Sequence, residues 1–236
     1  MEGFDLKTLA LAISILLCGF NAPALADCGR RGDPCKVPLG DYYVAQPTQE
    51  TNTPRPAIVH FHGGGGDGFA VVEDRQMVEP MIARGYIVIA PQGLPRPPLG
   101  NGWTFRSDHD PKRDELAFLR EVVTDAAKRF DIDRARVLVS GHSVGGSIAW
   151  YIACRAPQDF AAFAPVAGGF WRPHPESCAG PAKILHTHGW EDPVVQLEGR
   201  TFRRPQFTAQ QGDIFEGLQL WRRMNGCETQ APSSMA

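Results

Sequence analysis

The chain has 236 residues, of which 43% are hydrophobic, and a formal net charge of −2. This size suits one hydrophobic core and is short for two. Charges of both signs are interspersed, so the composition excludes a basic face for nucleic acid and a polybasic anchor for a lipid surface, and it favours a small molecule or a neutral polymer as partner.

The N-terminus has the features of a secretory signal peptide. An apolar stretch over Leu9–Phe20 is followed by Ala24–Ala26, a small-x-small pattern that is typical of a cleavage site before Asp27. The stretch is shorter than the ~20 residues that a spanning helix needs. Acidic residues outnumber basic ones before it, which leaves a membrane anchor as the alternative. We expect a signal peptide over residues 1–26, one domain over 27–236, an extracellular or periplasmic location and no stable membrane association.

The cysteine content fits an oxidising compartment. Five cysteines remain after cleavage, and they are Cys28, Cys35, Cys154, Cys178 and Cys227. Cys28 and Cys35 are close enough in sequence to close a small loop, so we predict a disulfide between them. Cys154 could pair with Cys178, although spacing does not fix the connectivity. That arrangement leaves one thiol, Cys227, without a partner.

From Pro56 onward, short β-rich runs alternate with helical patterns, which predicts a mostly parallel sheet with helices on both faces. The runs cover 57–61, 86–90, 136–140, 160–167 and 182–188, and apolar residues recur at helical spacing over 119–130 and 214–224. We interpret YYVAQP near Tyr42 as an antiparallel edge strand and 91–102, dense in Pro and Gly, as an irregular loop. The short stretch 167–181 leaves no space for a lid domain, so we expect an open site at the carboxyl ends of the strands.

The pentapeptide Gly141–Gly145, GHSVG, matches the G-x-S-x-G pattern of a nucleophilic serine. It follows the predicted strand 136–140 and precedes the helical sequence SIAWYIAC, which is the strand-turn-helix context that a nucleophile elbow needs. A glycine-rich turn without chemistry is the alternative, but the context favours Ser143 as the nucleophile. Flanking glycines fit because a Cβ there would collide with the neighbouring helix or strand.

The sequence HFHGGGGDG, at the end of the first strand of the predicted sheet, favours an oxyanion hole. Backbone N–H groups in such a loop stabilise the negative charge of a tetrahedral intermediate by about 3 kcal/mol per donor. We assign one donor to Val144 and the other to Gly64, with Gly63 next in line. A phosphate-binding loop is disfavoured because its Lys and Ser/Thr are absent, and we interpret His62 as structural.

The sequence HTHGWEDPVV offers an acid after the run at 182–188. Asp192 lies four residues past the strand end, where a carboxylate can orient an imidazole and stabilise its cation. Glu191 is the weaker candidate. A turn-capping role for Asp192 is the alternative, because Asp-Pro is a common turn opener.

Taken together, VHFHGGGG, FDIDRARVLVSGHSVGG, DFAAFAPVAGG, HTHGWEDPVV and LWRRMNGC resemble the secreted esterases of the polyhydroxybutyrate depolymerase and feruloyl esterase type, within the α/β-hydrolase superfamily. The resemblance spans about Pro56 to Cys227. It implies Ser143 as nucleophile, Asp192 as acid and no cofactor. It also implies a histidine in a loop beyond the last helix and a cysteine there that would pair with Cys227.

The sequence has no histidine after His188. The superfamily order of serine, acid and histidine is therefore not completed, and we expect a C-terminally shortened α/β-hydrolase fold, without the final strand and the histidine loop, whose activity is slight. His186 and His188 could substitute only with awkward geometry, and His142 should point away from the substrate. The two H-x-H pairs lack further ligands at motif spacing, so no metal is expected.

We conclude from the sequence that the chain encodes a serine-dependent carboxylic ester hydrolase, which acts on a polyester or on a feruloyl or acetyl polysaccharide ester. The aromatic residues Trp103, Phe170, Trp171 and Trp190 are expected near the site, with Trp103 and Trp190 as pocket candidates. A secreted pseudoenzyme that binds such a polymer and a serine peptidase on the same fold are the alternatives.

Overall fold

The computed structural model describes residues 28–29, 32–49, 51–105, 112–204 and 207–227, so the predicted signal peptide lies outside the described residues. The helices are α1 (Gly68–Glu73), α2 (Arg75–Ala83), α3 (Glu115–Phe130), α4 (Val144–Arg155) and α5 (Ile214–Met224). The strands are β1 (Cys35–Val37), β2 (Gly40–Ala45), β3 (Arg55–Phe61), β4 (Ile87–Pro91), β5 (Leu94–Pro95), β6 (Asn101–Gly102), β7 (Ile132–His142), β8 (Ala162–Val166), β9 (Thr201–Arg204) and β10 (Phe207–Gln210).

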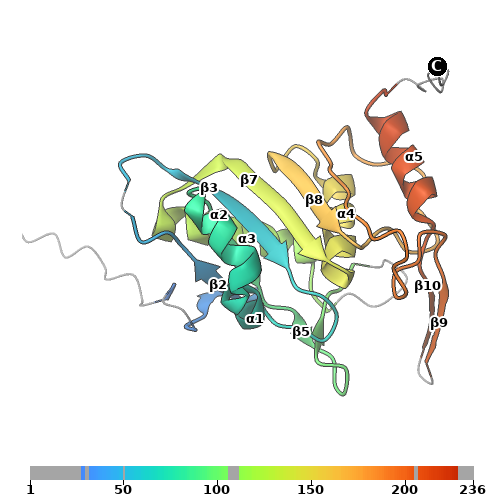
Figure 1. Cartoon of the computed structure of the whole chain (residues 1–236), viewed down its shortest axis with the longest axis horizontal. Helices are drawn as coiled ribbons and strands as arrows, with labels where there is room; N and C mark the ends of the chain where they lie inside the picture. Colours follow the sequence, from blue (N-terminus) through green and yellow to red (C-terminus); the bar gives the residue numbers. More distant parts are fainter. Residues whose placement is uncertain (1–27, 30–31, 50, 106–111, 205–206, 228–236) are drawn as a thin grey trace, which may run out of the picture.

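The centre of the molecule is a six-stranded sheet in the order β1-β2-β4-β3-β7-β8 (Figure 1). The strands β4, β3, β7 and β8 run parallel to one another, and β2 is antiparallel to both of its neighbours. The sheet is thus mostly parallel, as predicted. Because its parallel strands are joined by helical crossovers, their carboxyl ends meet at one edge, and that edge carries the candidate site.

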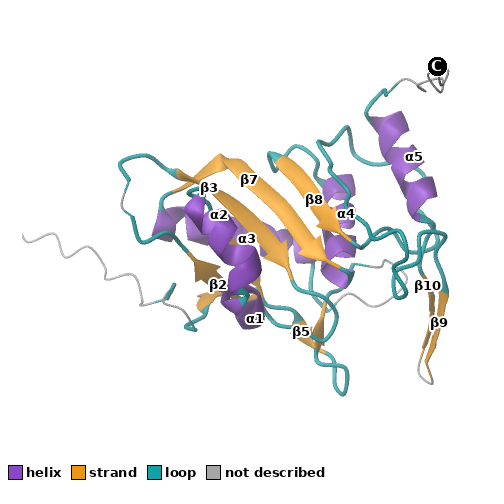
Figure 2. Ribbon diagram, viewed as in Figure 1, coloured by secondary structure: helices purple, strands orange, loops and turns teal. Residues whose placement is uncertain are grey.

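Helices cover both faces of the sheet (Figure 2). The residues of β4 are buried throughout and alternate between two cores. Ile89 packs into the large core with α3 and α4, whereas Ala90 packs with Val71 and Val72 of α1 on the other face. This double burial explains why the strand is a continuous apolar run in the sequence.

Four local expectations differ from the structure. The strand at Tyr42 is antiparallel, but β1 lies outside it and forms the edge of the sheet. The loop 91–102 contains the short pair β5 and β6, and the helices α1 and α2 and the hairpin β9–β10 were not predicted. The run 182–188 joins β8 only through two isolated parallel bridges, at Ile184 and Thr187.

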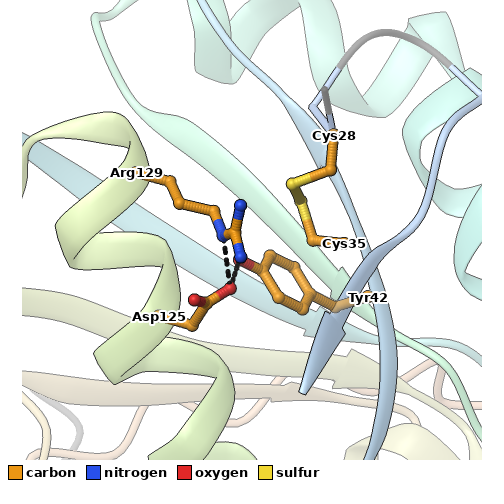
Figure 3. The surroundings of a disulfide bond; sticks show 5 residues. All are labelled: Cys28, Cys35, Tyr42, Asp125 and Arg129. Atoms are coloured by element: carbon orange, nitrogen blue, oxygen red, sulfur yellow. Dashed lines mark hydrogen bonds and ion pairs between the residues drawn. A yellow bond between two sulfur atoms is a disulfide. The ribbon is translucent and has the colours of Figure 1, made fainter. Parts of the chain in front are cut away.

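Two disulfides tie the described chain. The predicted bond between Cys28 and Cys35 is present, and it lies beside Tyr42, whose hydroxyl donates to Asp125 at 2.7 Å, while Arg129 donates to the same carboxylate (Figure 3). The second bond joins Cys154 at the end of α4 to Cys178. Cys227 is free and exposed.

Within the described ranges, none of the helices combines the length and the hydropathy that crossing a bilayer requires.

Candidate active site

Ser143 lies at the sharp turn between β7 and α4. Its backbone has φ 56° and ψ −118°, a combination that side-chain-bearing residues rarely adopt. The surroundings hold this conformation, because the Ser143 N–H donates to the carbonyl of Val166 at 2.9 Å and the Ser143 carbonyl accepts from Ser147 at 3.0 Å. Strained backbone of this kind costs about 1–3 kcal/mol and is concentrated at functional sites.

Glycines allow the backbone segments around Ser143 to cross closely. A Cβ on Gly141 would lie 2.5 Å from the carbonyl carbon of Gly145, and one on Gly145 would lie 2.6 Å from the His62 carbonyl oxygen. A Cβ on Gly168 would meet the Ser147 nitrogen at 2.6 Å. The glycines that surround the serine in the sequence are therefore required by β3, β7 and the loop after β8, which all approach the start of α4.

The glycine loop, residues 62–66, lies against the serine. A Cβ built on Gly63 would be 3.7 Å from Ser143 Cβ, and one on Gly64 would be 3.3 Å from a methyl group of Val144. The structure therefore brings together Ser143, Val144, Gly63 and Gly64. Their roles as nucleophile and oxyanion donors remain hypotheses that this geometry permits.

Two backbone N–H groups in this arrangement are available to a ligand. Val144 is the first residue of α4, where N–H groups have no partner inside the helix and the helix end is electropositive. Among the described residues, neither the Val144 N–H nor the Gly64 N–H has a hydrogen-bond acceptor. A developing oxyanion could accept from both.

His62 is fixed as a structural residue. Its Nε2 accepts from the Gly93 N–H at 3.0 Å, so its Nδ1 carries the proton and donates to the Gly63 carbonyl at 2.7 Å. Burial lowers the pKa of His62, which keeps the ring neutral. Both ring nitrogens are engaged in holding the glycine loop.

Asp192 lies in the turn after the run 182–188. Its Oδ1 accepts from the N–H groups of Val194 at 2.8 Å and Val195 at 2.9 Å, which is the capping role that the sequence left open. Desolvation acts to raise the pKa of Asp192, but these hydrogen bonds and the fields of His188 and His142 outweigh it and lower the pKa.

His186 and His188 form a chain of hydrogen bonds beside Asp192. The indole of Trp150 donates to His186 Nδ1 at 3.3 Å, and His186 Nε2 lies 3.0 Å from His188 Nδ1. His188 Nε2 lies 2.6 Å from the carbonyl of Val195 and 3.7 Å from Asp192 Oδ2. All four ring nitrogens are thus engaged. Burial and the neighbouring His188 lower the pKa of His186 to about 4.

The two pocket candidates lie in opposite environments. Trp103 is only 1% exposed, and its indole packs edge-on against Phe61 beneath the glycine loop, so it cannot line an open pocket and that expectation is corrected. Trp190 is 80% exposed and contacts Phe215 of α5 edge-on, with the ring centroids 6.3 Å apart.

Phe170 and Trp171 both contact α4, the helix that begins after Ser143. The Phe170 ring packs edge-on against Trp150, with the centroids 4.9 Å apart, and the Trp171 indole donates to Ser147 Oγ at 3.3 Å.

The sequence reasoning missed Asn101. Its carbonyl accepts from the Gly65 N–H at 2.8 Å, and its side-chain amide donates to the Gly66 carbonyl at 2.8 Å, so it holds the far end of the glycine loop. The dipeptide Asn101–Gly102 is a strong turn signal that could have indicated a fixed backbone there.

Comparisons with known proteins found similarities of sequence and of fold. The sequence model of a protein family, the Prolyl oligopeptidase family, matches residues 73–171. Feruloyl esterase C of Emericella nidulans is 25% identical over 171 residues, which cover 69% of this chain and 58% of that protein. A bifunctional acetylxylan esterase/xylanase of Neocallimastix patriciarum is 28% identical over 153 residues, which cover 61% of this chain and 21% of that protein.

The architecture is similar to that of the acetyl xylan esterase from Aspergillus awamori, with a TM-score of 0.58 and 18% identity, over 82% of this chain and 77% of that chain. The chain spans less than two thirds of the length of the two curated relatives above.

Proposed function

We propose that this chain, which has the α/β-hydrolase fold and esterases among its relatives, is a carboxylic ester hydrolase that acts through an acyl-serine intermediate. The observation that carries the proposal is the strained conformation of Ser143, held directly beside the glycine loop and the free N–H groups of Val144 and Gly64. This is the arrangement that acyl transfer needs around one reacting carbon.

The reaction follows from these positions. Ser143 Oγ forms a bond to the ester carbonyl carbon and passes its proton to a solvent water molecule, because the ring nitrogens of His186 and His188 are engaged. The former carbonyl oxygen takes up negative charge between the Val144 and Gly64 N–H groups. Collapse of the intermediate expels the alcohol, which takes a proton, and leaves the acyl group on Ser143. Water then attacks the acyl-serine in the same way and releases the acid. Asp192 is the acid that we propose for this site, and its Oδ2 lies 3.7 Å from His188 Nε2.

A polysaccharide ester is the substrate class that we propose. The feruloyl esterase and the acetylxylan esterase among the relatives support it, as does an aromatic side chain, Trp171, that lies against α4 and could contact a bulky acyl group. We also propose that residues 27–236 act outside the cytoplasm as one catalytic domain after removal of residues 1–26. Two disulfides in the described part of the chain support that location.

The test is hydrolysis of p-nitrophenyl acetate, methyl ferulate and acetylated xylan by the purified chain and by S143A. We expect turnover of at least one ester that is lost in S143A. The rate is expected to be low, because His186 and His188 have no free ring nitrogen to accept the serine proton. Turnover that persists in S143A would refute the proposal, and binding of acetylated xylan without any turnover would favour a polymer-binding protein.

A serine peptidase is the second candidate, because the Prolyl oligopeptidase family model matches the segment that contains Ser143. The same nucleophile and oxyanion donors would attack an amide. A matched pair of substrates, an N-acyl amino acid p-nitroanilide and the corresponding p-nitrophenyl ester, separates the two functions. Ser143-dependent release of p-nitroaniline at a rate near that of the ester would favour the peptidase.

A further inference from the structure

The segment 92–104, between β4 and α3, contacts the glycine loop at both of its ends. At the first end, the indole Nε1 of Trp103 donates to the His62 carbonyl at 2.9 Å. The Gly93 N–H donates to His62 Nε2 at 3.0 Å. His62 is thus fixed through its backbone and its side chain, and the Trp103 ring lies over the His62 ring with the centroids 4.5 Å apart.

At the second end, Asn101 makes two hydrogen bonds in opposite senses. It accepts from the Gly65 N–H at 2.8 Å and donates to the Gly66 carbonyl at 2.8 Å. Gly65 has φ +81°, a conformation that glycine adopts readily but does not maintain on its own. Gly64 therefore lies between two clamped positions, and the direction of its N–H is set from outside the glycine loop.

A buried ion pair anchors the segment 92–104 itself. Arg113 Nη2 lies 2.8 Å from Glu115 Oε2, and the two side chains are only 4% and 3% exposed. Arg113 donates to the carbonyl of Gln92 at 3.1 Å, and Glu115 accepts from the Thr104 N–H at 2.9 Å. The two ends of the segment are therefore tied to the same pair at the start of α3, and the segment cannot move without disturbing a buried charge.

From these contacts we propose that Trp103 and Asn101 are positioning residues, which orient the Gly64 N–H toward the oxyanion formed at Ser143. The inference rests on the proposed function. Donors stabilise a transition state only when they already point to the developing charge, and a run of four glycines has little intrinsic rigidity. The hydrogen bonds from Trp103 and Asn101 to the glycine loop, called the clamp below, supply the rigidity that the loop lacks.

The test uses W103F, which keeps an aromatic ring in the core but removes the donor to His62. We expect kcat for p-nitrophenyl acetate to fall about 10- to 100-fold, with KM within about twofold, because misplacement of a catalytic group by about 1 Å costs on the order of 100-fold. Hydrogen exchange of the amides in residues 62–66 should also become faster. The matched control is W221F, because Trp221 is 2% exposed and its indole N–H has no partner among the described residues. The control should leave kcat and this exchange unchanged.

A second variant keeps the proposal falsifiable if W103F does not fold. N101A removes the side-chain donor to Gly66 at a partly exposed position, and it should also accelerate exchange in residues 62–66 and lower kcat with little change in KM. Unchanged exchange in a folded W103F and in N101A would overturn the inference. If the unmodified chain shows no Ser143-dependent turnover, the proposed function fails, and the exchange measurement still decides whether the clamp holds the glycine loop.

Discussion

Substitution of Gly145 by alanine should destabilise the protein and slow ester hydrolysis, although helix propensity alone predicts the opposite. Gly145 is in the first turn of α4, and in a helix alanine is favoured over glycine by about 1 kcal/mol. A Cβ at this position would lie 2.6 Å from the His62 carbonyl oxygen and closer still to the Phe61 carbonyl oxygen. The steric effect and the propensity effect therefore have opposite signs, and their magnitudes decide the outcome.

The steric effect is the larger of the two. Since real Cβ contacts below 3.0 Å are essentially absent, the end of β3 must move from α4 by at least about 0.4 Å at His62, and by more at Phe61. Both partners are backbone atoms, so no side chain can rotate away. Overpacking of this kind costs about 1–3 kcal/mol. The displaced strand also carries the glycine loop away from Val144, which should reduce kcat about 10- to 100-fold.

The assay combines urea unfolding with initial rates on p-nitrophenyl acetate. The matched control is G180A, because a Cβ on Gly180 would meet its nearest neighbour, Pro157, at an ordinary distance of 3.6 Å. We expect G180A to resemble the unmodified chain in both measurements. If G145A is as stable as the unmodified chain and retains kcat within about twofold, the argument from close backbone crossing is wrong.

Three further outcomes follow from the contacts in the core. Because the Cys154 to Cys178 loop spans 24 positions, replacing both cysteines by serine should lower the free energy of unfolding by about 3 kcal/mol, measured by urea denaturation under non-reducing conditions. E115Q should lower the free energy of unfolding by about 3–5 kcal/mol, because it leaves the Arg113 charge buried without its partner. A fall in the melting temperature measures this loss. Burial lowers the pKa of His60 from 6.5 to about 4, so the folded protein holds His60 in the neutral form. The free energy of unfolding should therefore fall, by up to about 3 kcal/mol, as the pH drops from about 6.5 toward 4. Urea denaturation at several pH values should show that H60L reduces this pH dependence.

The elbow could be predicted from the sequence because the residues that form it are consecutive in the chain. The required glycines, Gly141 and Gly145, flank Ser143 directly after an apolar strand, so they form a short motif even though the crossing at Gly145 is with the distant residues Phe61 and His62. The disulfide between Cys28 and Cys35, seven positions apart, also joins residues that are close in the chain. Residues this close together leave a pattern that a single sequence can show.

The environment of Trp103 could not be predicted in this way. A tryptophan after a Pro- and Gly-rich segment has the sequence context of an exposed loop residue, and we expected it in a pocket. Its burial depends on His62, 41 positions earlier, and on the ion pair at the start of α3. The helices α1 and α2 were missed for a different reason. Their N-caps, Asp67 and Asp74, are the signals that could have indicated them, since each side chain accepts from the N–H three residues on.

The histidine pair next to Asp192 is better explained as a support than as a proton acceptor. A base that takes the serine proton becomes cationic, and burial opposes that charge at His186, whose pKa lies near 4. Protonation would also leave the Trp150 indole without its acceptor. In the neutral state the chain runs in one direction, from Trp150 through both rings to the Val195 carbonyl, and it fixes the turn that holds Asp192. Asp192 Oδ1 accepts from the Val194 and Val195 N–H groups, and Asp192 Oδ2 lies 3.7 Å from His188 Nε2, so both oxygens contact groups of the turn that the histidine pair supports.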